Sequence, residues 1–132
     1  MRNDLELRHS APQEARHQTA QRRLHQQYGR QALAILRAMK DEPRSGEPLL
    51  DGYPYCEAEV RFILEHENAP RLNDVLCRRT EAQWLIWHHQ QPRLAEKVAA
   101  IMARYYQWPA QHREQEIARY LDYVRRTVSF IP

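Results

Sequence analysis

Two adjacent arginines are the residues of this 132-residue chain whose type and spacing most invite a chemical role. Arg78 and Arg79 stand in the segment DVLCRRTEAQW, between a short apolar turn and an aromatic run. Asp74 precedes Arg78 by four residues, in the acid-first order that favours a salt bridge along a helix. Such a pair could hold an anionic partner, serve catalysis, or bind carboxylates of the protein itself, since the guanidinium fork matches a carboxylate or a phosphate.

Acidic residues near the pair favour the structural role. Glu59 and Glu67 flank the inward face of the preceding predicted helix, and they could meet the arginines if the two elements pack antiparallel. Arginine suits partly buried carboxylates better than lysine does. We therefore predict an ion-pair motif that fixes one helix to the next and ends at an N-cap threonine. Its members are Glu59, Glu67, Asp74, Arg78, Arg79 and Thr80.

The other residues capable of chemistry form no recognisable site. Of the seven histidines, His88 and His89 are adjacent, so on a helix they point about 100° apart and cannot easily share one ion. There is no His-Glu-x-x-His, no zinc-finger spacing, no Gly-x-Ser-x-Gly, and three scattered glycines cannot build a phosphate loop. We expect this chain to supply no catalytic, cofactor-binding or metal-binding residue.

The charge balance permits an anionic partner without requiring one. The formal net charge is +3 and the pI about 9.1, but the 20 Lys and Arg are interleaved with 17 acids. The last predicted helix carries Arg119, Arg125 and Arg126 together with several acids, which makes a weak recognition helix. A small basic helical module that binds nucleic acid is therefore the alternative function, and it predicts strongly salt-dependent binding.

Cysteine usage and hydropathy suggest a reducing compartment. Cys56 and Cys77 are too few for a disulfide framework, and both fall where a helical pattern places apolar residues. We predict buried, reduced thiols. The chain has no apolar run long enough to span a bilayer, and its first ten residues lack the apolar core of a signal peptide. We expect a cytoplasmic protein, attached at most peripherally to something larger.

The elements that must position these residues are predicted to be helices. Glycine is scarce and strand-type alternation is almost absent, so we predict an all-α fold: a single compact bundle of about six helices. Residues 1–13 form a tail or linker and residues 14–132 the helical domain. We expect helices near 14–27, 30–40, 55–68, 71–79, 81–90, 92–106 and 110–128, the fourth being only about two turns long. One irregular connection with three prolines and two glycines spans 41–54.

The inward faces follow from the helical period of the apolar residues. Leu24 and Tyr28 form a modest edge on the first helix, which Gly29 should end. The predicted inward residues of the other helices are Leu33, Leu36, Met39 and Ile35; Cys56, Val60, Ile63 and Leu64; Leu72, Val75 and Leu76; Leu94, Val98, Ile101, Met102 and Tyr105; and Ile117, Leu121, Val124 and Val128. Leu49, Leu50 and Tyr53 should pack down from the irregular connection.

The stretch from Asp51 to Trp84 strongly resembles the C-terminal helical domain of FAD-dependent glycerol-3-phosphate dehydrogenases and glycerophosphate oxidases. The matching motifs are Tyr53-Pro54-Tyr55, Ala58-Glu59-Val60, Glu67, and Asp74 to Thr80. The likeness extends from about Glu14 to the C-terminus. Members of this family tend to have Ser or Thr where Arg71 stands, which would cap the short helix with Asp74 at N3. We expect that cap to be lost here.

The resemblance implies a supporting role. In this family a large N-terminal portion with a Gly-x-Gly-x-x-Gly turn holds FAD and substrate, and no such turn occurs here. The implied partner is a flavin domain or subunit, with self-association also open. The complete enzyme would contain FAD, convert glycerol 3-phosphate to dihydroxyacetone phosphate, and place this domain at the inner face of the membrane. This chain lacks the flavin and substrate domain, so we do not expect it to oxidise glycerol 3-phosphate alone.

Overall fold

The structure is a computed structural model that describes residues 21–51, 53–79 and 88–128, with the side chains of Pro54, Arg78, Arg79, His88 and Val128 outside the description. Within these residues the chain is mostly helical, with five helices and a small two-stranded hairpin. The described residues belong to two compact units, divided between Glu42 and Pro43.

The first unit holds two helices joined at a glycine. Residues 21–28 are helical, and Gly29 has a φ of 59°, in the left-handed region that glycine tolerates. The predicted stop at Gly29 is therefore confirmed. A 3₁₀ turn, η1 (Gly29–Gln31), leads into α2 (Ala32–Asp41). The buried residues of α2 are Ala32 and Ile35, whereas Leu33 is 53% exposed, so the prediction that Leu33 lies inward is wrong.

The second unit begins with a β-hairpin in place of the irregular connection. After the 3₁₀ turn η2 (Pro43–Gly46), strand β1 (Pro48–Leu50) pairs antiparallel with β2 (Tyr53–Cys56). The register shifts between the pairs Pro48–Cys56 and Leu50–Tyr53, as at a β-bulge. The purely α-helical prediction is thus corrected. It missed the strands because they are short and rich in proline, which weakens any strand pattern.

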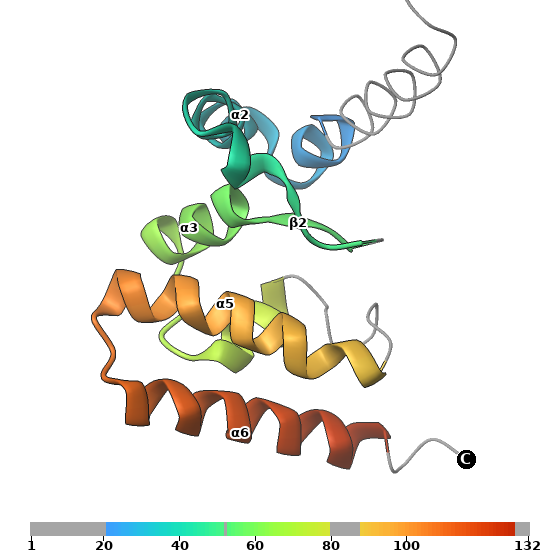
Figure 1. Cartoon of the computed structure of the whole chain (residues 1–132). Helices are drawn as coiled ribbons and strands as arrows, with labels where there is room; N and C mark the ends of the chain where they lie inside the picture. Colours follow the sequence, from blue (N-terminus) through green and yellow to red (C-terminus); the bar gives the residue numbers. More distant parts are fainter. Residues whose placement is uncertain (1–20, 52, 80–87, 129–132) are drawn as a thin grey trace, which may run out of the picture. The chain divides into compact units, whose positions relative to one another are not determined.

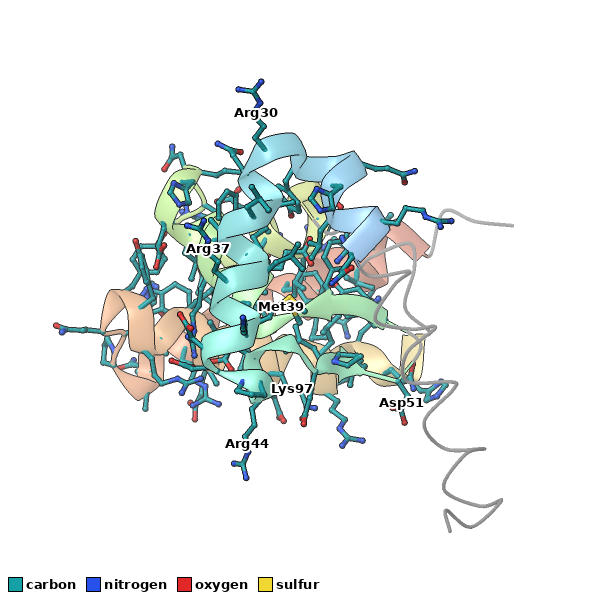
Figure 2. The ribbon with its side chains drawn as sticks, turned by 90° about the horizontal axis from the view of Figure 1, so that it is seen from above. Arg30, Arg37, Met39, Arg44, Asp51 and Lys97 are labelled. Carbon is teal, nitrogen blue, oxygen red and sulfur yellow. The ribbon has the colours of Figure 1, made fainter. Side chains whose placement is uncertain are left out.

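The hairpin packs down as predicted. Leu49, Leu50 and Tyr53 are all buried. The Nζ of Lys97, on a later helix, donates a hydrogen bond to the Leu49 carbonyl at 2.7 Å; Figure 2 labels Lys97 and, at the hairpin turn, Asp51. The hairpin is therefore held both by its apolar side chains and by a charge-assisted hydrogen bond.

Helix α3 (Glu57–His66) starts two residues later than predicted. Tyr55 and Cys56 belong to β2, and Cys56 is the N-cap with extended backbone (φ −130°, ψ 171°). The predicted inward residues Val60, Ile63 and Leu64 are buried. The helix ends where Glu67 adopts an extended conformation, three residues before Pro70.

The segment around the arginine pair is helical, but of an unexpected type. Leu72 and Asn73 are α-helical, and the residues of η3 (Asp74–Arg79) that follow them form a π-helix. Leu72, Val75 and Leu76 are fully buried, which confirms the predicted face. The predicted helix 81–90 lies mostly outside the described residues; its end forms the 3₁₀ turn η4 (His88–Gln90).

Two long helices complete the unit. Figure 1 shows α5 (Gln91–Tyr106) and α6 (Ala110–Val128) side by side and antiparallel. Pro92 stands in the first turn of α5, and α6 begins at Ala110, both as predicted. The turn between them uses Gln107 in a left-handed conformation (φ 59°).

The inward faces of α5 and α6 are largely those predicted. On α5, Leu94, Val98, Ile101 and Met102 are buried; on α6, Val124 is buried while Ile117 and Leu121 are partly buried. Tyr105 is 45% exposed, so its inward assignment is wrong. Its neighbour Tyr106 packs against the core instead.

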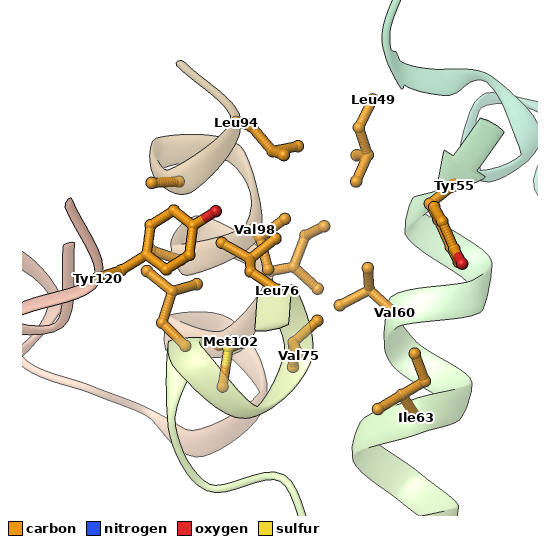
Figure 3. Close-up of a cluster of buried hydrophobic side chains, with 14 of the residues drawn as sticks. Leu49, Tyr55, Val60, Ile63, Val75, Leu76, Leu94, Val98, Met102 and Tyr120 are labelled. Atoms are coloured by element: carbon orange, nitrogen blue, oxygen red, sulfur yellow. The ribbon is translucent and has the colours of Figure 1, made fainter. Parts of the chain in front are cut away.

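One apolar core joins these elements. Figure 3 shows Leu49 and Tyr55 of the hairpin, Val60 and Ile63 of α3, Val75 and Leu76 of η3, Leu94, Val98 and Met102 of α5, and Tyr120 of α6. The hairpin and η3 are therefore integral to the core and are not surface additions.

Candidate functional site

The start of η3 is fixed by half of a capping box. The backbone N–H of Arg71 donates to Oδ2 of Asp74 at 3.0 Å, and the N–H of Asp74 donates to the carbonyl of Arg71 at the same distance. In a capping box the N3 side chain reaches back in this way to the N-cap N–H. Only the other half, which needs a Ser or Thr side chain at position 71, is missing. The expected loss of the cap is therefore partial.

The loop that leads into η3 is tied to the end of α5. The hydroxyl of Tyr106 donates to the carbonyl of Ala69 at 3.0 Å. Burial raises the pKa of Tyr106 above its ordinary value, and the charges of Tyr105 and Asp74 raise it further. The Asp74 carboxylate therefore lies near the C-terminal end of α5 as well as at the start of η3.

The predicted carboxylates lie on the elements that adjoin η3. Glu59 is fully buried on α3, which packs against η3, and Oε2 of Glu67 is buried just after α3 ends. Neither these two nor Asp74 is without a partner. The side chains of Arg78 and Arg79, and all of Thr80, lie outside the described residues. The ion pairs of the motif consequently stay a prediction.

A second ion-pair cluster is described completely. Oε1 of Glu57 accepts hydrogen bonds from Arg61 at 3.0 Å and from Arg104 at 2.9 Å. The first pair has i, i+4 spacing within α3, whereas the second joins α3 to α5 across 47 residues of sequence. The Arg104 side chain is 71% exposed, so this salt bridge between α3 and α5 lies at the surface and should contribute little to stability.

A buried polar pair joins α5 and α6, and no pattern in the sequence indicates it. The Tyr120 hydroxyl donates to Oε1 of Gln91 at 2.6 Å, and both residues are at most 1% exposed. Burial, with a smaller contribution from Cys77, raises the pKa of Tyr120 well above its ordinary value. A polar glutamine just before Pro92 gave no sign of burial, because its partner lies 29 residues away.

The remaining candidate residues form no separate site in the described part of the chain. Both cysteines are free thiols, Cys56 buried and Cys77 partly buried, in line with the prediction of reduced thiols. No described group of three or more His, Cys, Asp and Glu residues could hold a metal ion. No described helix has both the length and the apolar character needed to cross a membrane.

The basic residues of the nucleic-acid alternative, and aromatic residues that could stack on bases, have contacts within the fold. Tyr106 and Trp108 stack with ring centroids 5.9 Å apart, and both pack against the core. Arg125 and Arg126 each pair with Asp122, at 2.9 and 3.1 Å, on α6. Because these cations already have a local carboxylate, they are poor candidates for a phosphate-binding surface.

The fold defines the class: a mostly helical domain whose apolar core also includes a small two-stranded hairpin and η3. The chain belongs to the family of the C-terminal domain of alpha-glycerophosphate oxidase, whose model matches residues 4–113. It is similar to a probable mitochondrial glycerol-3-phosphate dehydrogenase of Dictyostelium discoideum, with 31% identity over 77% of this chain and 16% of the relative. It is also similar to a glycerol-3-phosphate dehydrogenase of Mycobacterium leprae, with 26% identity over 87% of this chain and 20% of the relative.

These similarities concern one part of a larger kind of protein. The chain spans 16% and 20% of the length of the two curated relatives. No solved structure matches the chain. The family is therefore established, whereas the activity of a complete enzyme is a matter for proposal.

Proposed function

We propose that this chain is the helical accessory domain of an FAD-dependent glycerol-3-phosphate dehydrogenase. It docks on the flavin domain, whether that domain belongs to the same polypeptide or to a separate subunit. The observation that carries the proposal is the family match over residues 4–113, together with two relatives that bear the dehydrogenase name. In the complete enzyme the flavin domain would hold FAD and oxidise glycerol 3-phosphate to dihydroxyacetone phosphate, and this chain would not catalyse the reaction alone.

The test is reconstitution in two parts. The purified chain is mixed with the flavin-containing portion of a glycerol-3-phosphate dehydrogenase that lacks its own C-terminal domain. We expect the two to co-elute in gel filtration and the oxidation of glycerol 3-phosphate by a dye acceptor to rise. The chain alone should show neither flavin absorbance nor activity. Activity of the chain by itself, or failure to associate with flavin portions of both curated relatives, would refute the proposal.

A control separates this function from nucleic-acid binding. Arg125→Gln combined with Arg126→Gln neutralises the two cations that pair with Asp122. The double variant should dock on the flavin portion as the unmodified chain does. If the chain were instead a nucleic-acid-binding module, it would bind duplex DNA or RNA in a salt-dependent way, and this variant would lose that binding.

We also propose a structural role for the motif of Glu59, Glu67, Asp74, Arg78, Arg79 and Thr80. The support is the fully buried Glu59 and the buried oxygen of Glu67, because buried carboxylates require compensation by cations or hydrogen bonds. Arg78→Ala should lower the melting temperature by several degrees, whereas Arg93→Ala, at an exposed position on α5, should leave it nearly unchanged. Equal melting of the two variants would contradict this role.

A further inference from the structure

The exposed face of α2 carries cations that have no carboxylate partner. Arg30, Arg37 and Lys40 are exposed, and within the described part of the chain none of them forms a hydrogen bond or an ion pair through its side chain. The acids nearest in sequence, Asp41 and Glu42, come only at the end of the helix. Arg37 precedes Asp41 by four residues, in the basic-first order that is less favourable for a salt bridge.

Helix α6 shows how the same chain arranges arginines that need no external partner. Arg119 lies 3.7 Å from Glu116, and Arg125 and Arg126 lie 2.9 and 3.1 Å from Asp122. In each case the acid stands three or four residues before the arginine. On α2 the positions three and four residues before each of the three cations hold Gln, Ala, Leu or Arg, so no local acid can neutralise them in this way.

An apolar side chain lies among these cations. Leu33 is 53% exposed, three residues after Arg30 and four before Arg37. Residues at these spacings, and Lys40 one turn further on, share one face of a helix. Figure 2 shows Arg30 at the start of this helix, pointing away from the ribbon. Protein interfaces combine apolar contacts with polar ones and are enriched in arginine, so this face has the composition of a docking surface.

The place of α2 in the chain fits contact with the rest of a larger protein. The family model matches residues 4–113, a range that includes all of α2 but only the first four residues of α6. The chain spans 16% and 20% of the length of the two curated relatives, so most of each relative lies outside this domain. A surface that docks on that remaining part throughout the family should lie within the matched residues.

We propose that the face of α2 formed by Arg30, Leu33, Arg37 and Lys40 docks on the flavin portion, and that an acidic patch of the flavin portion receives it. Cations left without a local acid are complementary to carboxylates of a partner, and such complementarity speeds association and fixes the orientation of the two proteins. Leu33 supplies the apolar contact. This inference rests on the proposed docking function and adds to it the surface and the charge of the partner.

The first test compares two double variants that lose the same charge. Arg37→Gln with Lys40→Gln removes two cations from α2, and Arg125→Gln with Arg126→Gln removes two from α6. Titration calorimetry measures the affinity of each for the flavin portion at low and high salt. The α2 variant should bind about tenfold more weakly than the unmodified chain, and its affinity should depend less on salt. The α6 variant should bind within about twofold of the unmodified chain.

The second test needs no variant, so it does not depend on how a substitution affects folding. A carbodiimide joins an amine directly to a carboxylate that contacts it. The chain has only two lysines, Lys40 and Lys97, and the Nζ of Lys97 donates to the Leu49 carbonyl. In the complex of the unmodified chain, Lys40 should be joined to an acidic residue of the flavin portion, whereas Lys97 should not. Mass spectrometry of the digested complex identifies the joined peptides.

The outcomes distinguish this inference from the proposed function. If the unmodified chain associates with neither flavin portion, both are refuted. If it associates but the two double variants bind equally, or if only Lys97 is joined to the partner, docking stands and the assignment to α2 is refuted. Tighter binding to phosphatidylglycerol vesicles or to duplex DNA than to the flavin portion, lost in the α2 variant, would also overturn the inference, because the partner would then not be an acidic protein surface.

Discussion

Helix α3 and the π-helix η3 carry the same sequence signal and fold differently. Each places an acid four residues before an arginine, Glu57 with Arg61 and Asp74 with Arg78. In α3 the pair forms at 3.0 Å, as an α-helix allows. In η3 the backbone is π-helical, and the side chain of Arg78 lies outside the described residues, so the Asp74–Arg78 pair stays a prediction. The same spacing of charges therefore occurs on two different types of helix.

Local sequence helps to explain the difference. The first residues of α3 are Glu57, Ala58 and Glu59, which combine good helix formers with acids that favour a helix N-terminus. η3 contains a β-branched valine, an aspartate and a cysteine, all weaker helix formers. Its conformation therefore depends more on burial of Val75 and Leu76 than on intrinsic preference.

We expect the largest loss of stability from substitutions that test whether η3 and α3 contribute equally to the core. Leu76→Ala in η3 and Ile63→Ala in α3 each empty a fully buried position. Each should lower the free energy of unfolding by about 4 kcal/mol, through lost transfer energy and the cavity left behind. Chemical denaturation followed by circular dichroism measures both. A loss below about 1 kcal/mol for Leu76→Ala alone would mean that η3 is not packed as α3 is.

The second prediction compares the stability lost on neutralising each of the two acids in the first turn of α3, Glu57 and Glu59. Glu59→Gln should cost about 3 kcal/mol, because Glu59 is fully buried and an amide cannot reproduce every interaction of a buried carboxyl group. Glu57→Gln, in the surface cluster with Arg61 and Arg104, should cost less than about 1 kcal/mol, and that loss should shrink at high salt. The same denaturation curves, recorded at low and high salt, give both values. Equal costs would contradict the buried role of Glu59.

A third prediction concerns the polar pair between α5 and α6 next to η3. Tyr120→Phe should cost about 2 kcal/mol, because Oε1 of Gln91 loses its buried donor. The folded-state pKa of Tyr120 is raised above its ordinary value of 10.0, so its neutral form is favoured in the fold. Its contribution is fully present below about pH 10 and is lost as the pH rises toward the folded-state pKa.

The pH dependence gives the control for that variant. Unfolding curves measured between neutral pH and pH about 11 should show a steeper loss of stability for the unmodified chain than for Tyr120→Phe, because only the former has this phenol to ionise. Parallel curves would mean that Tyr120 has an ordinary pKa and is not buried as described.

The smallest effect concerns the start of η3. Asp74→Asn keeps the size of the side chain but weakens the hydrogen bond from Arg71, and should cost about 1 kcal/mol. Arg71→Ser should restore the missing half of the capping box and raise the free energy of unfolding by a similar amount. Thermal unfolding should show a lower melting temperature for Asp74→Asn and a higher one for Arg71→Ser. A neutral Arg71→Ser would show that position 71 does not act as the N-cap.

Much of the fold could be predicted from periodicity. The long helices α5 and α6 have regular apolar stripes, with Leu94, Val98 and Met102 buried on α5 as expected. The hairpin could not be foreseen, because its short strands gain their stability from packing on the core and from Lys97 rather than from a strand pattern. Tyr105 was misassigned because a helical stripe near a terminus does not reveal which of two adjacent tyrosines meets the core.

The mostly helical class, the free cysteines and the family could be inferred from the sequence, because composition, apolar period and the motif from Asp74 to Thr80 are local properties of the chain. The Tyr120–Gln91 pair and the link between Glu57 and Arg104 join residues far apart in sequence, and the short hairpin depends on packing against the core, so these features became known with the tertiary structure. The π-helical turn at Asp74 belongs with these. Local preferences do not indicate its helix type, and its residues Val75 and Leu76 are buried in the shared core.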